Sequence, residues 1–438
     1  MARRLFFIVG VISFFIFSCD GEKEVAPSTT DKFIKLYPSS LVDVGVMIQE
    51  VSDGYIVLAN SSGGDRFVRL LHLDEYGNRT WSKLYNSGGE NGGEGSEDLV
   101  AKSMEVINDG EGYIIVADRI HSNDSTSAFL FKVDNSGGNF ISQGMFSSEL
   151  VTTLADGEYK AVDVEINNNE LVTLFQFEGV NTQNNHYILS KRNISDLTLL
   201  DGCTPLIKDQ SNYELLNAVF INETTGKTTY GAMVPRGNRV ISNIIAATNF
   251  TDCSYANIVS GLNDDEFTAF SGDLMGQQMI PSGENFCIVG TNIDGGEENI
   301  YISVVNENGS NITTKIYNED LTNSAEHVQY QGVNDSENID LSGNQSGYSI
   351  TRTSDNGFVI VGSNQNEDNI GNGIDVLMLK TDGFGNVKWF RSFGGADDEY
   401  GRYVIATSDG GYAILSNIQY GNVDMISLIK TDKNGHLN

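Results

Sequence analysis

The residues of this sequence best suited to chemistry are carboxylates gathered in polar, glycine-rich segments. Carboxylate oxygens bind Ca²⁺, contact ligand hydroxyl groups and, when two lie close together, act as general acid and base. These acids and a few neighbouring polar side chains are the predicted ligand-binding positions: Glu90, Glu94, Asp98, Asp294, Glu297, Glu298, His327, Tyr330, Glu367, Asp368, Asp397, Asp398 and Glu399.

Sequence motifs give little support to a dedicated metal site or a familiar enzyme. No Asp-x-Asp-x-Asp-Gly loop occurs, so solvated acidic loops are favoured over a built Ca²⁺ site. The five histidines are dispersed, and neither His-Glu-x-x-His nor Gly-x-Ser-x-Gly is present. We therefore assign no catalytic residue and expect no cofactor, with Ca²⁺ in the acidic loops as the one alternative left open.

Composition excludes some classes of partner. The chain has 59 acidic and 27 basic residues, a formal charge of -32 and a pI near 4.3, so nucleic acid would be repelled. Hydrophobic residues make up 39% of the chain, enough for a folded core. The 47 glycines against 5 prolines indicate many tight turns.

The N-terminus has the pattern of an export signal. Arg3 and Arg4 precede an apolar run at residues 5–17 that is too short to span a membrane. The run ends at Ser18-Cys19, which resembles the lipobox of bacterial lipoproteins, although Phe17 is bulkier than usual. The resemblance implies a signal peptide at residues 1–18, a lipid on Cys19 and a tether at 19–30; the alternative is an ordinary secreted protein.

The acidic residues 20–24 further resemble the tethers of surface-exposed lipoproteins, or are merely a solvated linker. We expect an exported protein anchored to the outer membrane at the cell surface, touching the membrane through its lipid alone. Three cysteines then remain, Cys203, Cys253 and Cys287. Pairing of the first two and burial of free thiols are equally weighted alternatives.

The rest of the chain is a repeat. A turn followed by an aromatic and apolar strand recurs clearly at residues 53–57, 111–115, 356–360 and 411–414, with weaker copies near Leu171, Thr229 and Phe286. Successive copies lie 54 to 72 residues apart. Each clear copy reads as four strands, with an Asp-x-x-Gly-Asn-type turn before the fourth, as at 74–78 and 382–386. Trp81 and Trp389 lie seven residues after the turn aspartate, which favours packing between repeats over sugar stacking.

Four antiparallel strands at this period are typical of propeller blades. The pattern resembles bacterial repeat β-propeller lipoproteins and covers nearly everything from Asp31 onward. The expected fold is all-β: one domain at residues 31–438, a monomeric seven-bladed β-propeller. Residues 33–37 copy residues 81–85, so we expect this N-terminal strand to complete the last blade and close the ring.

The two faces of such a disc should differ. The first and third turns are short and uniform, whereas the other loops vary, including 86–98, 364–373 and the extra segment 319–347. Variable polar loops on a rigid scaffold commonly carry binding sites, although surface loops also drift freely. We expect a non-catalytic binding or scaffold module for a protein or glycan. The alternatives are a glycosidase or polysaccharide lyase with acids on that face, and a purely structural spacer.

Overall fold

The structure is a computed structural model, which describes the fold of most of the repeat region. It covers residues 30–91, 96–108, 111–144, 157–167, 170–179, 186–203, 273–306, 311–317, 326–331, 334–336, 343–365, 373–421 and 423–437, with four two-residue strands between 221 and 259. No helix in these residues has the length and apolar composition needed to cross a membrane. Cys19, the signal segment and the tether up to residue 29 lie outside the described residues.

The described chain is all-β, with six sheets of at least four strands. The first three follow the chain. The first holds β2 (Val42–Val51), β3 (Gly54–Ser62), β4 (Arg66–Asp74), β5 (Arg79–Asn86) and β6 (Gly89–Glu90). The second holds β7 (Asp98–Ile107), β8 (Gly112–Ile120), β9 (Thr126–Asp134) and β10 (Ile141–Gly144). The third holds β11 (Gly157–Asn167), β12 (Glu170–Gly179), β13 (His186–Arg192) and β14 (Leu199–Cys203).

Two short pairs follow, β15 (Ile221–Asn222) with β16 (Thr229–Tyr230) and β17 (Ile244–Ile245) with β18 (Ile258–Val259). The fourth large sheet holds β19 (Asp273–Ser282), β20 (Asn285–Asp294), β21 (Glu297–Asn306) and β22 (Asn311–Tyr317). The fifth holds β25 (Asn344–Arg352), β26 (Phe358–Gln365), β27 (Ile374–Thr381) and β28 (Val387–Gly394), extended by β23 (Glu326–Gln331) and β24 (Asn334–Ser336). The sixth holds β29 (Asp398–Ala406), β30 (Tyr412–Tyr420), β31 (Val423–Thr431) and β1 (Phe33–Tyr37).

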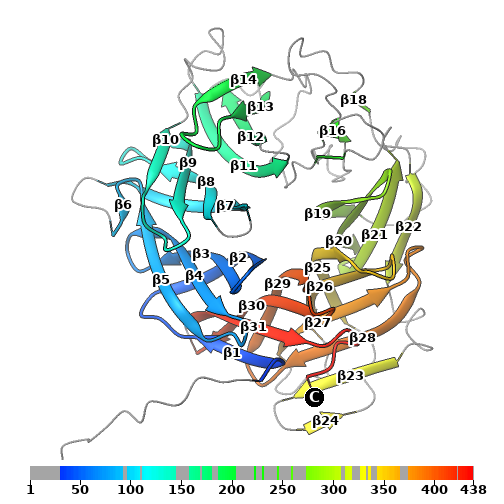
Figure 1. Cartoon of the computed structure of the whole chain (residues 1–438). Coiled ribbons are helices and arrows are strands. Elements are labelled where there is room, and N and C mark those ends of the chain that lie inside the picture. Colours follow the sequence, from blue (N-terminus) through cyan, green and yellow to red (C-terminus); the bar gives the residue numbers. More distant parts are fainter. Residues whose placement is uncertain are drawn as a thin grey trace, which may run out of the picture.

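The sheets succeed one another around a common centre (Figure 1). In each of them the strand that comes first in the repeat lies innermost, namely β2, β7, β11, β19, β25 and β29. Consecutive strands pair antiparallel within each sheet, which is the arrangement of propeller blades.

Residues 33–37 pair as the sequence predicts. β1 runs antiparallel to β31, with Phe33 opposite Lys430 and Tyr37 opposite Ile426, so the two ends of the chain share one sheet. The hydroxyl of Tyr37 donates to the carbonyl of Gly77 in the first sheet at 2.8 Å. Tyr85 and Tyr317 make the same contact with Gly137 and Gly385 of the sheets that follow theirs, at 2.7 and 2.9 Å. A buried outer-strand tyrosine thus links neighbouring sheets.

A polar residue at one position of the second strand links neighbouring sheets nearer the axis. It accepts a hydrogen bond from the backbone N–H of an inner-strand residue in the next sheet, and so satisfies a buried donor. The four such bonds are Ala101 to Asn60 (2.7 Å), Ala161 to Asp118 (2.7 Å), Gly347 to Thr291 (3.2 Å) and Gly45 to Asn417 (3.1 Å). The last of these joins the sixth sheet to the first.

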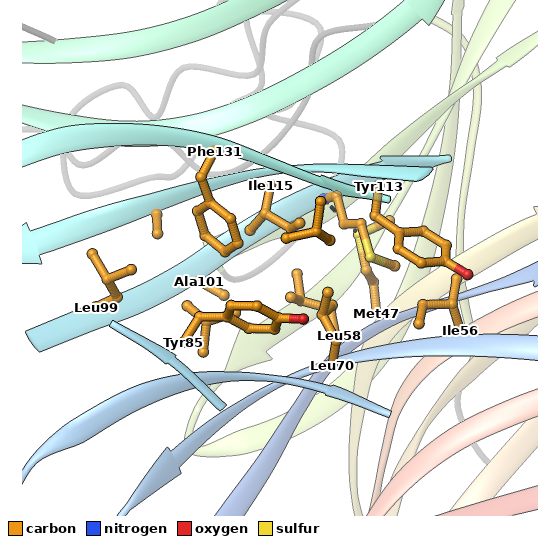
Figure 2. Packing of buried hydrophobic residues seen from close by; sticks show 14 of the residues in the cluster. Met47, Ile56, Leu58, Leu70, Tyr85, Leu99, Ala101, Tyr113, Ile115 and Phe131 are labelled. Carbon is orange, nitrogen blue, oxygen red and sulfur yellow. Dashed lines mark hydrogen bonds between the residues drawn. The ribbon is translucent and has the colours of Figure 1, made fainter. Parts of the chain in front are cut away.

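Apolar side chains fill the space between adjacent sheets. Figure 2 shows the layer between the first two, where Leu58 and Tyr85 meet Tyr113 and Phe131. Each of these side chains is almost fully buried, a change worth about 1.5–3 kcal/mol per large residue. Trp81 lies 6.2 Å from Tyr113 of the second sheet, measured between ring centroids, so it packs between sheets as the repeat predicts.

One segment differs from expectation. Residues 319–347 were expected to form a long polar loop, but β23 within it pairs in parallel with β28 on the outer edge of the fifth sheet. An uncovered edge strand exposes a row of backbone donors and acceptors, and β23 satisfies them along β28. This segment is therefore partly structural.

Candidate functional site

The innermost strands carry an irregularity that sequence reasoning missed. In each of the six, the register with the second strand slips by one residue at the same place. A small residue precedes each slip: Gly45, Ala101, Ala161, Gly276, Gly347 and Gly401. A Cβ on Gly401 would lie 2.6 Å from the carbonyl oxygen of Gly362 in the fifth sheet, so this close approach requires a small residue. The extra residues of these β-bulges are Val46, Lys102, Val162, Gln277, Tyr348 and Arg402.

These bulges surround a cavity of about 340 Å³ at the centre of the molecule. Five of the six extra residues line it, and in β11 the next residue, Asp163, does so instead. The lining is Gly45, Val46, Met47, Lys102, Ser103, Glu105, Asp163, Val164, Glu165, Gln277, Gln278, Met279, Ile280, Pro281, Tyr348, Arg402 and Tyr403. We call this space the axial cavity; its volume lies at the lower end of the range for small-molecule sites.

One side of the axial cavity is acidic. Burial raises the pKa of Glu105 well above its ordinary value, and the nearby carboxylates of Glu165 and Asp163 raise it further. Burial, followed by repulsion from Asp163, raises the pKa of Glu165 to about 8. Gln49 donates a hydrogen bond to Glu105 at 3.3 Å, which favours the charged form but does not outweigh these effects. Glu165 is therefore mostly protonated at neutral pH, and the pKa of Glu105 is shifted in the same direction.

The cavity also contains two cations in different situations. Lys102 pairs with Asp118 of the same sheet, with 3.1 Å between its Nζ and Oδ2. The Nε of Arg402 is buried and has no hydrogen-bond partner among the described residues. The Arg402 guanidinium lies 5.4 Å from the centre of the Tyr348 ring and 5.3 Å from that of Tyr400, which hold it by cation–π contacts.

None of the positions predicted from sequence lines the axial cavity. Glu90, on β6, pairs with Lys83 at 2.8 Å. Asp98 begins β7, and Asp294 and Glu297 close the hairpin between β20 and β21. Glu298 accepts a hydrogen bond from Ser346 of the neighbouring sheet at 2.7 Å. These side chains are dispersed over several sheets, and their binding role stays a prediction.

The run at 397–399 lies between the fifth and sixth sheets. Asp398 accepts a hydrogen bond from the backbone of Ile374 at 3.0 Å, and Glu399 accepts one from Gly395 at 3.3 Å. Burial raises the pKa of Glu399 to about 8, and the nearby Asp375, Asp397 and Asp398 add to the shift. Asp398 thus binds the backbone at the start of β27 in the fifth sheet, and Glu399 binds the backbone of the loop that precedes β29.

The remaining predicted positions are on the outer edge or outside the described residues. His327 and Tyr330 belong to β23, in register with Phe390 and Phe393 of β28. Glu94, Glu367 and Asp368 lie outside the described residues. No group of three or more histidine, cysteine or acidic side chains suited to a metal ion occurs in the part of the chain that the structure describes. Cys287 is a buried free thiol, and Cys253 and the side chain of Cys203 are not described.

In a second polar cluster an acid, a histidine and a serine contact one another in sequence, as they do in the catalytic triad of a hydrolase. His121 lies with its Nδ1 2.7 Å from Glu97 Oε1 and its Nε2 2.8 Å from Ser127 Oγ. Arg119 binds the same two partners, at 3.2 Å from Glu97 Oε2 and 3.3 Å from Ser127 Oγ. None of these residues lines the axial cavity, and Arg119 and Ser127 are paired across one hairpin. The cluster therefore has a structural role: it joins the β8–β9 hairpin to the residue that precedes β7.

A similar group in the first sheet belongs to the repeat. His72 lies 3.1 Å from Asp53 and 2.6 Å from the hydroxyl of Thr80. Lys380 with Asp355 and Lys430 with Asp409 occupy the equivalent positions of the fifth and sixth sheets, at 2.8 and 2.7 Å. Because the same pairing of a basic side chain with a turn aspartate recurs in three sheets, we assign it a structural role. The axial cavity remains the strongest candidate site.

Comparisons with known proteins bear on the fold alone. The sequence matches no protein-family model and none of the curated proteins. Its structure is similar to that of Sqt1 from Saccharomyces cerevisiae, with a TM-score of 0.47 at 12% identity over 92% of this chain and 99% of that one. A Trypanosoma rangeli sialidase in complex with sialic acid gives 0.40 at 10% over 90% and 59%. The α-L-arabinofuranosidase Arb93A from Fusarium graminearum gives 0.41 at 9% over 92% and 96%. At such identities and TM-scores these likenesses carry no conclusion about function.

Proposed function

We propose that this protein is an exported, lipid-anchored, non-catalytic binding module, built as a closed seven-bladed propeller. In this proposal the six large sheets are six of the blades and β1 is the strand that closes the ring, whereas the expected seventh blade falls in a stretch that lies almost wholly outside the described residues. Its ligand, a protein or a glycan, reaches the axial cavity, and the variable polar loops contribute contacts around it. The lipid on Cys19 would hold the propeller at the outer surface of the outer membrane.

The observation that supports binding is the chemistry of the axial cavity. The sheets repeat the small residue before each bulge, but the side chains that line the cavity do not repeat: Val46, Lys102, Gln277, Tyr348 and Arg402 occupy one structural position. Folding needs the small residue and the slip, and it does not need a half-buried arginine or a pair of glutamic acids at this place. Half-buried polar groups of this kind cost stability unless something binds them.

A second candidate is a glycosidase or polysaccharide lyase. Glu105 and Glu165 favour it, because acids near a central cavity are what this reaction class requires, and a carboxyl group with a pKa of about 8 can act as a general acid. We prefer the binding module to the enzyme because the cavity is lined by the cations Arg402 and Lys102, the latter paired with Asp118, as well as by acids.

The binding proposal is tested by filling the axial cavity. The double variant Val46→Trp/Gln277→Trp adds bulk at two bulge positions, where Tyr348 shows that an aromatic side chain is accommodated. On glycan arrays and in pull-downs, the mature wild-type protein should bind a ligand, and this variant should bind the same ligand at least about tenfold more weakly. Val423→Trp, on the exposed part of β31, is the matched control and should bind as the wild type does. Equal retention by the filled variant would place binding elsewhere, and steady turnover of a polysaccharide would select the enzyme.

The anchoring proposal is tested in intact cells. Wild type and Cys19→Ala are labelled with a radioactive fatty acid and then treated with an external protease. We expect label on the wild type alone, and digestion of the wild-type propeller at the surface. Labelled but protected protein would place the propeller in the periplasm, and absence of label would refute the lipobox interpretation.

A further inference from the structure

We infer that a pocket at the outer edge of the first sheet binds an oxyanion of the sulfate or phosphate type, either free or as an ester on a larger molecule. The pocket has a volume of about 450 Å³, and residues of β4, β5 and β6 line it together with Asn91. Figure 1 shows β5 and β6 on the outside of the molecule. We call this space the outer pocket. It shares no residue with the axial cavity, so the inference goes beyond the proposed function.

One wall of the outer pocket is the guanidinium group of Arg69, a residue that is only 9% exposed. Its Nε donates to Asp43 Oδ1 at 3.1 Å and to Ser61 Oγ at 2.9 Å. Its Nη1 donates to Ser82 Oγ at 3.0 Å. Partners on β2, β3 and β5 thus fix the plane of the group. Its Nη2 makes no hydrogen bond to any residue that the structure describes, which leaves these donors for a ligand.

The other polar groups around the outer pocket are also donors without acceptors. The exposed guanidinium of Arg79 and the side-chain amide of Asn91 make no hydrogen bond or ion pair among the described residues. The hydroxyl of Ser82 accepts a hydrogen bond from Arg69 and donates its own proton to no described residue. Donors on two strands and a loop therefore meet at one place. Sulfate and phosphate groups accept such bonds on several oxygens at once, and charged donors strengthen them.

The acids near the outer pocket are already paired. Glu90, the one carboxylate of its lining, lies with its Oε2 2.8 Å from the ammonium group of Lys83. Asp43 accepts its hydrogen bond from Arg69. The charge of Arg79 is thus uncompensated among the described residues, although the whole chain has a formal charge of -32. Salt confines the repulsion from distant exposed acids to about 8 Å at physiological ionic strength, so an anion can bind here.

Strand register places the two arginines on one face of the first sheet. β4 and β5 pair Leu71 with Ser82. Past one extra residue of β5 they pair Leu73 with Arg79. Paired residues lie on the same face of a sheet, and so do alternate residues of one strand. Arg69, two residues before Leu71, therefore shares its face with Ser82 and Arg79.

The repeat requires neither arginine. Arg69 lies five residues before the turn aspartate Asp74, and Arg79 lies five residues after it. The residues at the equivalent positions of the second, fifth and sixth sheets are Phe129, Leu377 and Ser427 for the first arginine and Asn139, Val387 and Leu437 for the second. These sheets form without a cation at either place, which favours a ligand as the reason for the pair.

Calorimetric titrations of the mature protein at low ionic strength test the inference. The probes are sodium sulfate, glucose 6-sulfate, glucose 6-phosphate, glucuronate and glucose. We expect both sugar esters to bind, glucose to give no heat of binding, and glucuronate to bind more weakly because a planar carboxylate offers fewer oxygens. Sulfate that binds as tightly as the esters would identify the free ion as the ligand, and tighter binding of the esters would identify an ester. Added sodium chloride should weaken all of these interactions.

Variants locate the binding. Arg79→Gln should weaken the binding of both esters at least about tenfold, because a charge-assisted hydrogen bond is lost. Arg66→Gln is the matched control, since it removes the same charge from an exposed arginine of β4 outside the pocket, and it should bind as the wild type does. Arg69→Lys keeps a positive charge beside Asp43 but removes the Nη2 donors, and it should also weaken binding. The filled variant of the axial cavity should bind the esters as tightly as the wild type.

Three results would overturn the inference. The first is that neither sulfate nor either ester binds. The second is an equal loss in Arg66→Gln and Arg79→Gln, which would mean attraction by overall charge rather than a site. The third is glucuronate that binds as tightly as the esters, which would replace the sulfate and phosphate class by carboxylates. None of these results bears on the axial cavity, whose ligand is decided by the filled variant.

Discussion

Deletion of residues 31–38 should abolish the single cooperative unfolding transition of the protein. The deletion removes all of β1, whose five residues pair with β31. It also removes the hydrogen bond that the Tyr37 hydroxyl donates to the carbonyl of Gly77. The Lys35 ammonium group loses its hydrogen bonds to the carbonyl of Tyr76, at 2.5 Å, and to the side chain of Asn78, at 2.7 Å. These contacts connect the sixth sheet to the first. Without them β31 becomes an open edge, and the ring is left without its outer closing strand.

The measurement is urea unfolding followed by tryptophan fluorescence, since Trp81 and Trp389 lie in the first and fifth sheets. We expect a broad, low-midpoint transition or soluble aggregates, whereas deletion of the tether at residues 19–30 should leave the curve unchanged. If the loss of β1 leaves the midpoint and slope at their wild-type values, ring closure through this strand is wrong. Tyr37→Phe gives a graded version, with an expected loss of about 1 kcal/mol from one buried hydrogen bond.

The repeat made the sheets predictable because each sheet is a local structure. A turn aspartate, a glycine and an alternating apolar strand lie within a few residues of one another, so Asp74 and Gly77 specify their turn without information from elsewhere. The structure has this turn, with the backbone N–H of Gly77 donating to Asp74 and a φ of 73° at the glycine. The copy of the fourth strand at residues 33–37 could be predicted equally well, because Lys35 and Tyr37 match Lys83 and Tyr85 of the first sheet.

The axial cavity was not predictable in the same way. The bulge at Gly401 depends on the distance to Gly362 in the neighbouring sheet, and the raised pKa of Glu165 depends on its burial in a cavity that residues of β7 and β29 also line. Both are properties of several sheets together. One signal was present, the recurrent small residue in the middle of each inner strand, as in Gly45 and Ala101. The carboxylates of the loops are clustered in the sequence, whereas those of the cavity are clustered only in space.

Gly401→Val should lower the free energy of unfolding by about 3 kcal/mol, the upper end of the cost of overpacking a tight interior. The new side chain would enter the space between the fifth and sixth sheets, where the added Cβ alone would be 2.6 Å from the carbonyl oxygen of Gly362 and closer still to the side chain of Val361. The sheets must separate to admit it. Because Arg402 follows directly and lines the cavity, the same variant should weaken ligand binding.

Gly395→Val is the matched control, since a Cβ at Gly395 meets only the end of the Glu399 side chain at 3.8 Å. Gly401→Ala should fall between the two, because Ala101 and Ala161 hold the same position in the second and third sheets. Urea denaturation of the three variants gives the order directly. A valine at position 401 with wild-type stability would mean that the spacing of these sheets is set elsewhere, and that the small residue before each bulge has no part in forming the axial cavity.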